Sequence, residues 1–147
     1  METCFTASRI LLGHTPADVW AFIRPAETSA LLEPEVVRAF SVPGTGPGVG
    51  EQQIAIIGDG EHQEARLLTV VAEGEGWAET LSDEGVRIRS EVTPAGRGTR
   101  LALTAWPPEA SGGGGQLTRV HLDDREHHLA TYLDAYLDAV KAHLEDR

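Results

Sequence analysis

The stretch that decides the fold of this chain is LTRVHLDDREHHLATYLDAYLDAVKAHLE, residues 117–145. As one helix it would reach ~40 Å at ~1.5 Å rise per residue, more than twice the length of an average helix of ~11–12 residues. Helical spacing puts its large apolar side chains on one stripe: Leu122, Leu129, Leu133, Tyr136, Leu137, Val140 and Leu144. A helix this long with one apolar side must lie across a core, and what it covers decides the function.

The residues before this helix show short apolar segments separated by turns. Residues 4–12 predict a strand that stops at Gly13, and Thr15-Pro16 supplies an N-cap hydroxyl and a first-turn proline for a helix that Pro25 ends. A second short helix is predicted over residues 26–32. Six further strands are predicted over residues 36–42, 51–57, 62–72, 77–81, 86–92 and 99–106. Because these strands are consecutive and closely spaced, the sequence predicts one α+β domain over residues 1–147 with an antiparallel meander of seven strands.

Bulk composition excludes several classes of function. The net charge of −11 and the pI near 4.8 argue against nucleic acid, because binding phosphate requires clustered Lys and Arg. Cys4 is the single cysteine, and the adjacent His127 and His128 point about 100° apart on a helix, so we predict no metal and no cofactor. No apolar run approaches a membrane span, and the start lacks a signal peptide, so we expect a cytoplasmic protein. Eleven arginines against one lysine suggest a high-GC bacterium.

Three segments resemble one known superfamily. They are HTPADVWAFI (14–23), PGTGPGVGEQ (43–52) and TPAGRGTRLALT (93–104), which are similar to the first helix and two turns of helix-grip domains. These domains are START-like and pollen-allergen-like proteins, with the polyketide cyclase/dehydrase and lipid-transport relatives grouped as SRPBCC. The resemblance implies a curved seven-stranded sheet wrapped around the long carboxy-terminal helix, with a cavity for a hydrophobic ligand between them. It implies no catalytic residue, because the matched segments are turns and caps.

Alternating residues of the predicted strands could line such a cavity. The inward set that we expect is Ile54, Ile56, Leu68, Val70, Ile88, Val92, Leu101 and Leu103, although a bulge would reverse the parity of a strand. The alternative is a collapsed core made of the same residues. Trp77 begins a strand beside a glycine turn and is a candidate ligand platform, but aromatic residues in small domains usually belong to the core. Arg66 and Glu64 share a strand face that is either inside the cavity or on the exposed side.

Polar candidates lie along the long helix itself. His121, Arg125, His128 and Tyr132 are spaced four, three and four residues apart and form a row that continues to Tyr136. This row could surround the mouth of a cavity and orient or protonate a carbonyl substrate. The alternative is the solvated flank of an amphipathic helix. Glu126 falls within the apolar stripe, where it either contacts a ligand or reaches the open end of the helix.

Three functions follow from these observations. The first is binding of a small hydrophobic molecule of lipid or polyketide type. The second is a polyketide cyclase or dehydratase that uses His, Tyr and Glu residues of the cavity, and the third is a protein-interaction module of co-chaperone type with a filled interior. We expect a monomer or homodimer, and nothing in the sequence selects the ligand.

Overall fold

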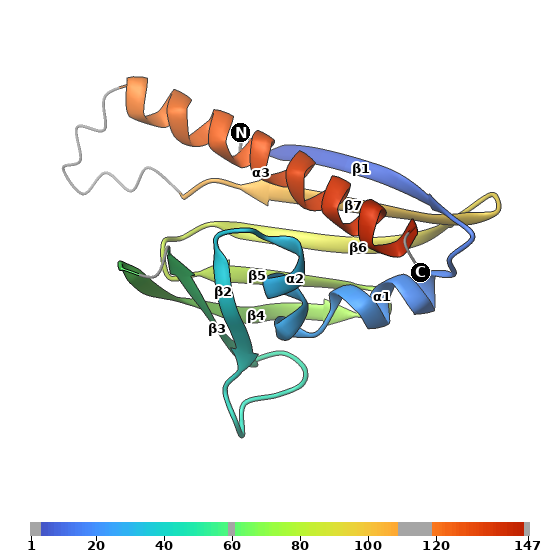
Figure 1. Ribbon diagram of the computed structural model, residues 1–147, viewed down its shortest axis with the longest axis horizontal. Helices are drawn as coiled ribbons and strands as arrows, with labels where there is room; N and C mark the ends of the chain where they lie inside the picture. The colour runs from blue at the N-terminus through green and yellow to red at the C-terminus, as the bar shows by residue number, and fades with distance from the viewer. Residues whose placement is uncertain (1–3, 59–60, 109–118, 146–147) are drawn as a thin grey trace.

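The structure is a computed structural model that describes residues 4–58, 61–108 and 119–145, with side chains from residue 128 onward in the last range. In these residues, seven strands form one antiparallel sheet in the order β1-β7-β6-β5-β4-β3-β2 (Figure 1). The strands are β1 Phe5–Leu12, β2 Val36–Ser41, β3 Gln52–Gly58, β4 Gln63–Gly74, β5 Trp77–Ser82, β6 Arg87–Ala95 and β7 Gly98–Trp106. The predicted meander is therefore confirmed, since β2 to β7 are neighbours in chain order and β1 pairs with β7.

The connection from β1 to β2 contains short helices whose ends follow from local chemistry. Helix α1 (Pro16–Ile23) begins where the hydroxyl of Thr15 accepts a hydrogen bond from the amide of Asp18 at 3.1 Å. It ends before Pro25, as the sequence predicts. The next segment, predicted as one helix, is a 3₁₀ turn η1 (Ala26–Thr28) followed by α2 (Ser29–Leu32). The hydroxyl of Thr28 donates to the carbonyl of Phe22, which folds this segment back onto α1.

Helix α3 (Arg119–Glu145) lies along β1 and β7 and also contacts α2 (Figure 1). Its predicted stripe is confirmed for the described side chains, because Leu133, Leu137, Val140 and Leu144 are buried. They pack in the main core with Val19 of α1 and Leu101 and Leu103 of β7, among others. On the edge strand, Arg9 forms ion pairs of 3.1 Å with Asp134 and Asp138 of α3. The helix is thus fixed to the sheet by apolar burial on one side and by charges at the sheet edge.

Strand alternation decides which side chains face α3. In β6, Ile88 and Ser90 face the interior and Arg89 the outside, as predicted. The parity predicted for residues 51–57 is wrong for Ile54 and Ile56. Their neighbours Gln53, Ala55 and Ile57 face inward, so Ile54 and Ile56 lie on the outer face of β3. The sequence pattern could not decide which face of β3 points inward, because this strand carries apolar residues on both faces.

Candidate functional site

A cavity of about 880 Å³ lies between the inner face of the sheet and the helices α1, α2 and α3. Side chains from β3 to β7 form its floor, and Leu129, Tyr132 and Tyr136 of α3 face it from the other side. The apolar part of its wall consists of Trp20, Ile23, Val36, Ala55, Ile57, Leu68, Val70, Ala78, Val86, Ile88, Leu103, Pro108 and Leu129. The interior is therefore not filled by side chains, which was the alternative to a cavity.

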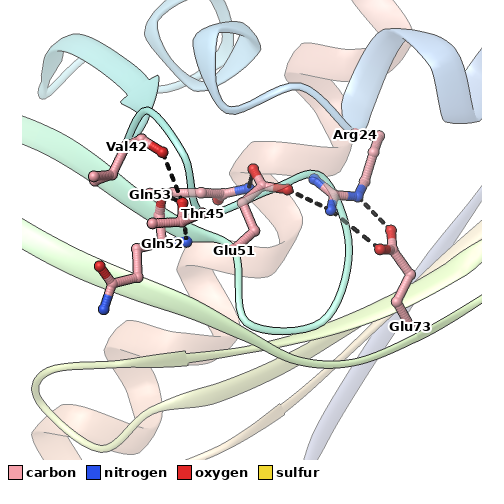
Figure 2. Close-up of polar contacts among 7 residues, drawn as sticks. All are labelled: Arg24, Val42, Thr45, Glu51, Gln52, Gln53 and Glu73. Carbon is pink, nitrogen blue, oxygen red and sulfur yellow. Dashed lines mark hydrogen bonds and ion pairs between the residues drawn. The ribbon is translucent and has the colours of Figure 1, made fainter.

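A group of three charged side chains lies at the end of α1 (Figure 2), and one of them, Arg24, lines the cavity. The guanidinium of Arg24 donates from Nε to Glu73 Oε2 at 2.5 Å and from Nη2 to Glu51 Oε1 at 2.7 Å. The three side chains are 16%, 20% and 4% exposed for Arg24, Glu73 and Glu51. Gln53 donates to the second oxygen of Glu51 at 2.9 Å. This group, called the Arg24 triad below, joins α1 to the start of β3 and to β4.

The glycine-rich loop between β2 and β3 positions Glu51 for this triad. A side chain at Gly46 would place its Cβ 2.5 Å from Glu51 Cγ, so the loop approaches the glutamate as closely as only glycine allows. The hydroxyl of Thr45 donates to the carbonyl of Val42 and accepts from the amide of Gln52, which closes the loop (Figure 2). The segment predicted as a simple hairpin turn therefore has a second role, which is to hold a buried carboxylate.

The contacts within the Arg24 triad shift the pKa of Glu51 and of Arg24. Burial alone would raise the pKa of Glu51, but the hydrogen bonds from Arg24 and Gln53 and the charge of Arg24 outweigh burial and lower it. The pKa of Arg24 is raised, mainly by its hydrogen bond to Glu73 and against the effect of burial. Both shifts favour the charged forms of Arg24 and Glu51. With one cation and two carboxylates, the triad keeps one net negative charge.

A second cluster on the cavity wall combines carboxylates with phenols. The rings of Tyr132 and Tyr136 on α3 stack with centroids 6.3 Å apart and an interplanar angle of 29°. Burial raises the pKa of Glu33, and an interaction with the Tyr132 hydroxyl opposes this rise. Burial likewise raises the pKa of both tyrosines, and the charge of Glu33 raises it further. Glu33, Glu35, Tyr132 and Tyr136 are called the Glu–Tyr cluster below, and all four line the cavity.

Arg66 is the other cation on the wall. It pairs with Glu64 at 2.8 Å and with Glu84 at 3.0 Å, so it too is held between two carboxylates. Of the two sequence alternatives for Arg66, the structure adopts the one in which its side chain lines the cavity.

The structure places the sequence-predicted residues as follows. The side chains of His128, Tyr132, Tyr136, Ile88 and Leu103 line the cavity. Trp77 does not line it, because its ring covers Gly74 on the outer face of the sheet and stacks under the guanidinium of Arg89 at 4.2 Å. The side chains of His121, Arg125 and Glu126 lie outside the described residues.

Sequence reasoning missed the carboxylates and the arginine that give the cavity its charge. Glu33 and Glu35 flank Pro34 between two elements, and Arg24 directly precedes Pro25. In the sequence, all three residues are typical of the end of a helix. A local signal did exist for Arg24, since a cation is favoured at the carboxyl end of a helix. Nothing local predicts its partners, because Glu51 and Glu73 are 27 and 49 residues away.

In the described part of the chain, no three His, Cys, Asp or Glu side chains come together in a way that could hold a metal ion. No helix in the described ranges is both long and apolar enough to cross a membrane.

The order of elements, the curved sheet and the covering helix define the helix-grip fold of START-like proteins, as the sequence predicts. The solved structure of Ara h 8.0201 is similar over 100% of both chains, with a TM-score of 0.74 and 13% identity. The Polyketide_cyc-like protein Cgl2372 from Corynebacterium glutamicum matches with a TM-score of 0.71 and 18% identity, covering 99% of this chain and 93% of its own. A START superfamily protein from Mycobacterium smegmatis matches with a TM-score of 0.66 and 13% identity over 97% of each chain.

No protein-family model matches the sequence, and no curated protein matches it either. At identities this low, the similarity establishes the fold and leaves the function to the site.

Proposed function

We propose that this protein binds a small hydrophobic molecule in the cavity beneath α3. The observation that carries the proposal is the cavity itself, whose volume of about 880 Å³ lies within the ~300–1,000 Å³ typical of ligand pockets. Protein interiors otherwise pack without voids larger than a few water molecules. An apolar wall interrupted by a few polar groups is the usual composition of such pockets, because burial supplies affinity and the polar groups supply orientation.

Relatives in fold support the same proposal. Cgl2372 carries the name Polyketide_cyc-like protein and the Mycobacterium smegmatis protein that of a START superfamily protein, and resemblance to these groups implies a cavity for a hydrophobic ligand. A co-chaperone-like interaction module has less support, because that alternative predicted a filled interior. The cyclase or dehydratase alternative stays a prediction, to be tested by product formation with a His128→Ala, Tyr132→Phe double variant.

The test compares two neighbouring residues of β5 that face opposite sides of the sheet. Thr80 lines the cavity, whereas Leu81 is 41% exposed on the outer face. Thermal shift and native mass spectrometry would first identify binders among dodecanol, a sterol and an aromatic polyketide. Thr80→Phe should then weaken binding at least about tenfold, because its ring occupies ligand space, and Leu81→Phe should leave affinity within about twofold.

Two results would overturn the proposal. One is that none of the three molecules binds the wild-type protein. The other is that Thr80→Phe, with a urea midpoint like that of the control variant, binds as tightly as the wild type.

A further inference from the structure

The cavity wall carries two arginines in the described part of the chain, and each is already paired with two carboxylates. Arg24 is hydrogen-bonded to Glu51 and Glu73, and Arg66 is paired with Glu64 and Glu84. Each of these groups keeps one net negative charge. An anionic ligand would therefore meet an excess of negative charge around each arginine, which disfavours its binding.

The Glu–Tyr cluster differs from these groups because no cation pairs with its carboxylates among the described residues. Glu33 interacts with Tyr132 and Ser29, and the other charge acting on it is that of Glu35, which is also negative. Neither glutamate takes part in an ion pair with a described Lys, Arg or His side chain. Two carboxylates thus face the cavity with room for a positive partner.

The tyrosines add a second recognition element on the same wall. The stacked rings of Tyr132 and Tyr136 line the cavity beside Glu33, and Tyr136 makes no hydrogen bond to another described residue. No buried side-chain polar atom in the described chain lacks a partner, so the Tyr136 hydroxyl opens into the cavity space. Aromatic faces attract cations electrostatically, and a phenol oxygen accepts a hydrogen bond from an N–H group. Carboxylates next to aromatic faces are the combination that recognises an ammonium group.

We propose that the cavity selects amphiphilic amines, whose apolar body lies among the β3–β7 side chains and whose ammonium group binds Glu33 and Glu35 beside the two tyrosine rings. This inference rests on the proposed function and narrows its ligand class. It makes fatty-acid anions poor ligands, since each arginine described on the wall is already paired with two carboxylates.

The experiment uses three ligands with the same chain and different polar ends. Dodecylamine, dodecanol and dodecanoate compete, below micelle-forming concentrations at pH 7.4, for a neutral fluorescent probe bound to the full chain. Dodecylamine should bind at least about tenfold more tightly than dodecanoate, with dodecanol between them.

A charge-matched pair of variants separates the site from the overall charge of the protein. Glu33→Gln/Glu35→Gln should weaken dodecylamine binding about tenfold and leave dodecanol within about twofold. The control Glu27→Gln/Glu75→Gln changes net charge equally at two exposed positions away from the cavity wall, and should leave all three affinities within about twofold. Retained dodecanol binding shows that the cavity is intact. If the double variant loses dodecanol as well, the single variant Glu35→Gln, at an exposed position, replaces it and should still weaken the amine.

The outcomes distinguish this inference from the function on which it rests. Dodecanoate binding as tightly as dodecylamine would overturn the amine proposal and leave hydrophobic binding standing. Equal losses in the site variant and in the control would assign the preference to the net charge of −11 and overturn it as well. No displacement by any of the three ligands would count against the proposed function itself.

Discussion

Replacing Arg24 by methionine tests the Arg24 triad, because it removes the cation and keeps an unbranched side chain of similar length. Glu51 and Glu73, whose side chains are 4% and 20% exposed, would then lose the cation that they share. Leaving buried charges uncompensated in this way costs about 3–5 kcal/mol. A domain of this size typically has a free energy of unfolding of about 5–15 kcal/mol, so the variant should fold with clearly reduced stability.

The loss should depend on pH, with a sign that the structure fixes. In the wild type, the lowered pKa of Glu51 contributes stability above its unfolded value of about 4.5, and this contribution is lost as the pH falls through the folded pKa. Without Arg24, burial is opposed only by the hydrogen bonds from Gln53 and Ser41, so the pKa of Glu51 should rise relative to the wild type. The stability that ionised Glu51 contributes above about pH 4.5 is then reduced, so the deficit of the variant is larger at pH 7 than at pH 4.

The assay is urea unfolding at both pH values, monitored by circular dichroism. The dependence of the unfolding free energy on urea concentration should be the same for all variants that are compared. The matched control is Arg9→Met. The ion pairs of Arg9 involve Asp134 and Asp138, which are 59% and 67% exposed, so the free energy of unfolding should fall by less than about 1 kcal/mol.

The triple variant Arg24→Met/Glu51→Gln/Glu73→Gln should recover at least about half of the stability that the single variant loses, since none of the three charges remains. A loss below about 1 kcal/mol for Arg24→Met at pH 7, or one that does not change with pH, would refute the reasoning.

Two further predictions use the tryptophans. Trp20 lines the cavity whereas Trp77 lies on the outer face, so Trp20→Phe should abolish a ligand-induced change in intrinsic fluorescence that Trp77→Phe retains; the reverse result would contradict the placement of the cavity. Gly74→Val should displace the Trp77 ring, because a Cβ at Gly74 would overlap it, and should cost about 1–3 kcal/mol in urea unfolding. A Gly74→Val protein as stable as the wild type would show that the ring does not cover this glycine.

The fold was predictable from the sequence because its elements carry local signals. Thr15 and Pro16 start α1, Pro25 stops it, and the periodic leucines from Leu129 to Leu144 define the buried side of α3. Each of these signals lies within a few residues of the structure that it specifies. The same locality explains why the order of the strands followed from their spacing.

The face of each strand was less predictable, because parity depends on contacts that are distant in sequence. Residues 86–92 alternate apolar and charged side chains, so their inward face was clear. Ile54, Ile56 and Ile57 have similar hydropathy, and only pairing with β2 and β4 decides which of them face α3.

The charged part of the candidate site could not be found from the sequence at all. Arg24, Glu51 and Glu73 come from three separate elements, and each looks like a solvated residue in its own segment. The row on α3 was visible because it lies on one helix. Of that row, His128 and Tyr132 reach the cavity wall, while the unpredicted Glu33 comes from the segment after α2.

Four arginines of this protein share one arrangement, in which a single guanidinium is held by two carboxylates. Each of these arginines contacts two acidic side chains: Arg9 on β1, Arg24 at the end of α1, Arg66 on β4 and Arg89 on β6. Such pairing is redundant, since loss of either acid leaves the arginine with the other. Mutational tolerance should therefore be asymmetric at these positions. Single acidic residues can change one at a time as the sequence drifts, whereas replacement of the part-buried Arg24 leaves two carboxylates without their cation. Holding one arginine with two acids also contributes to the excess of acidic residues in the sequence.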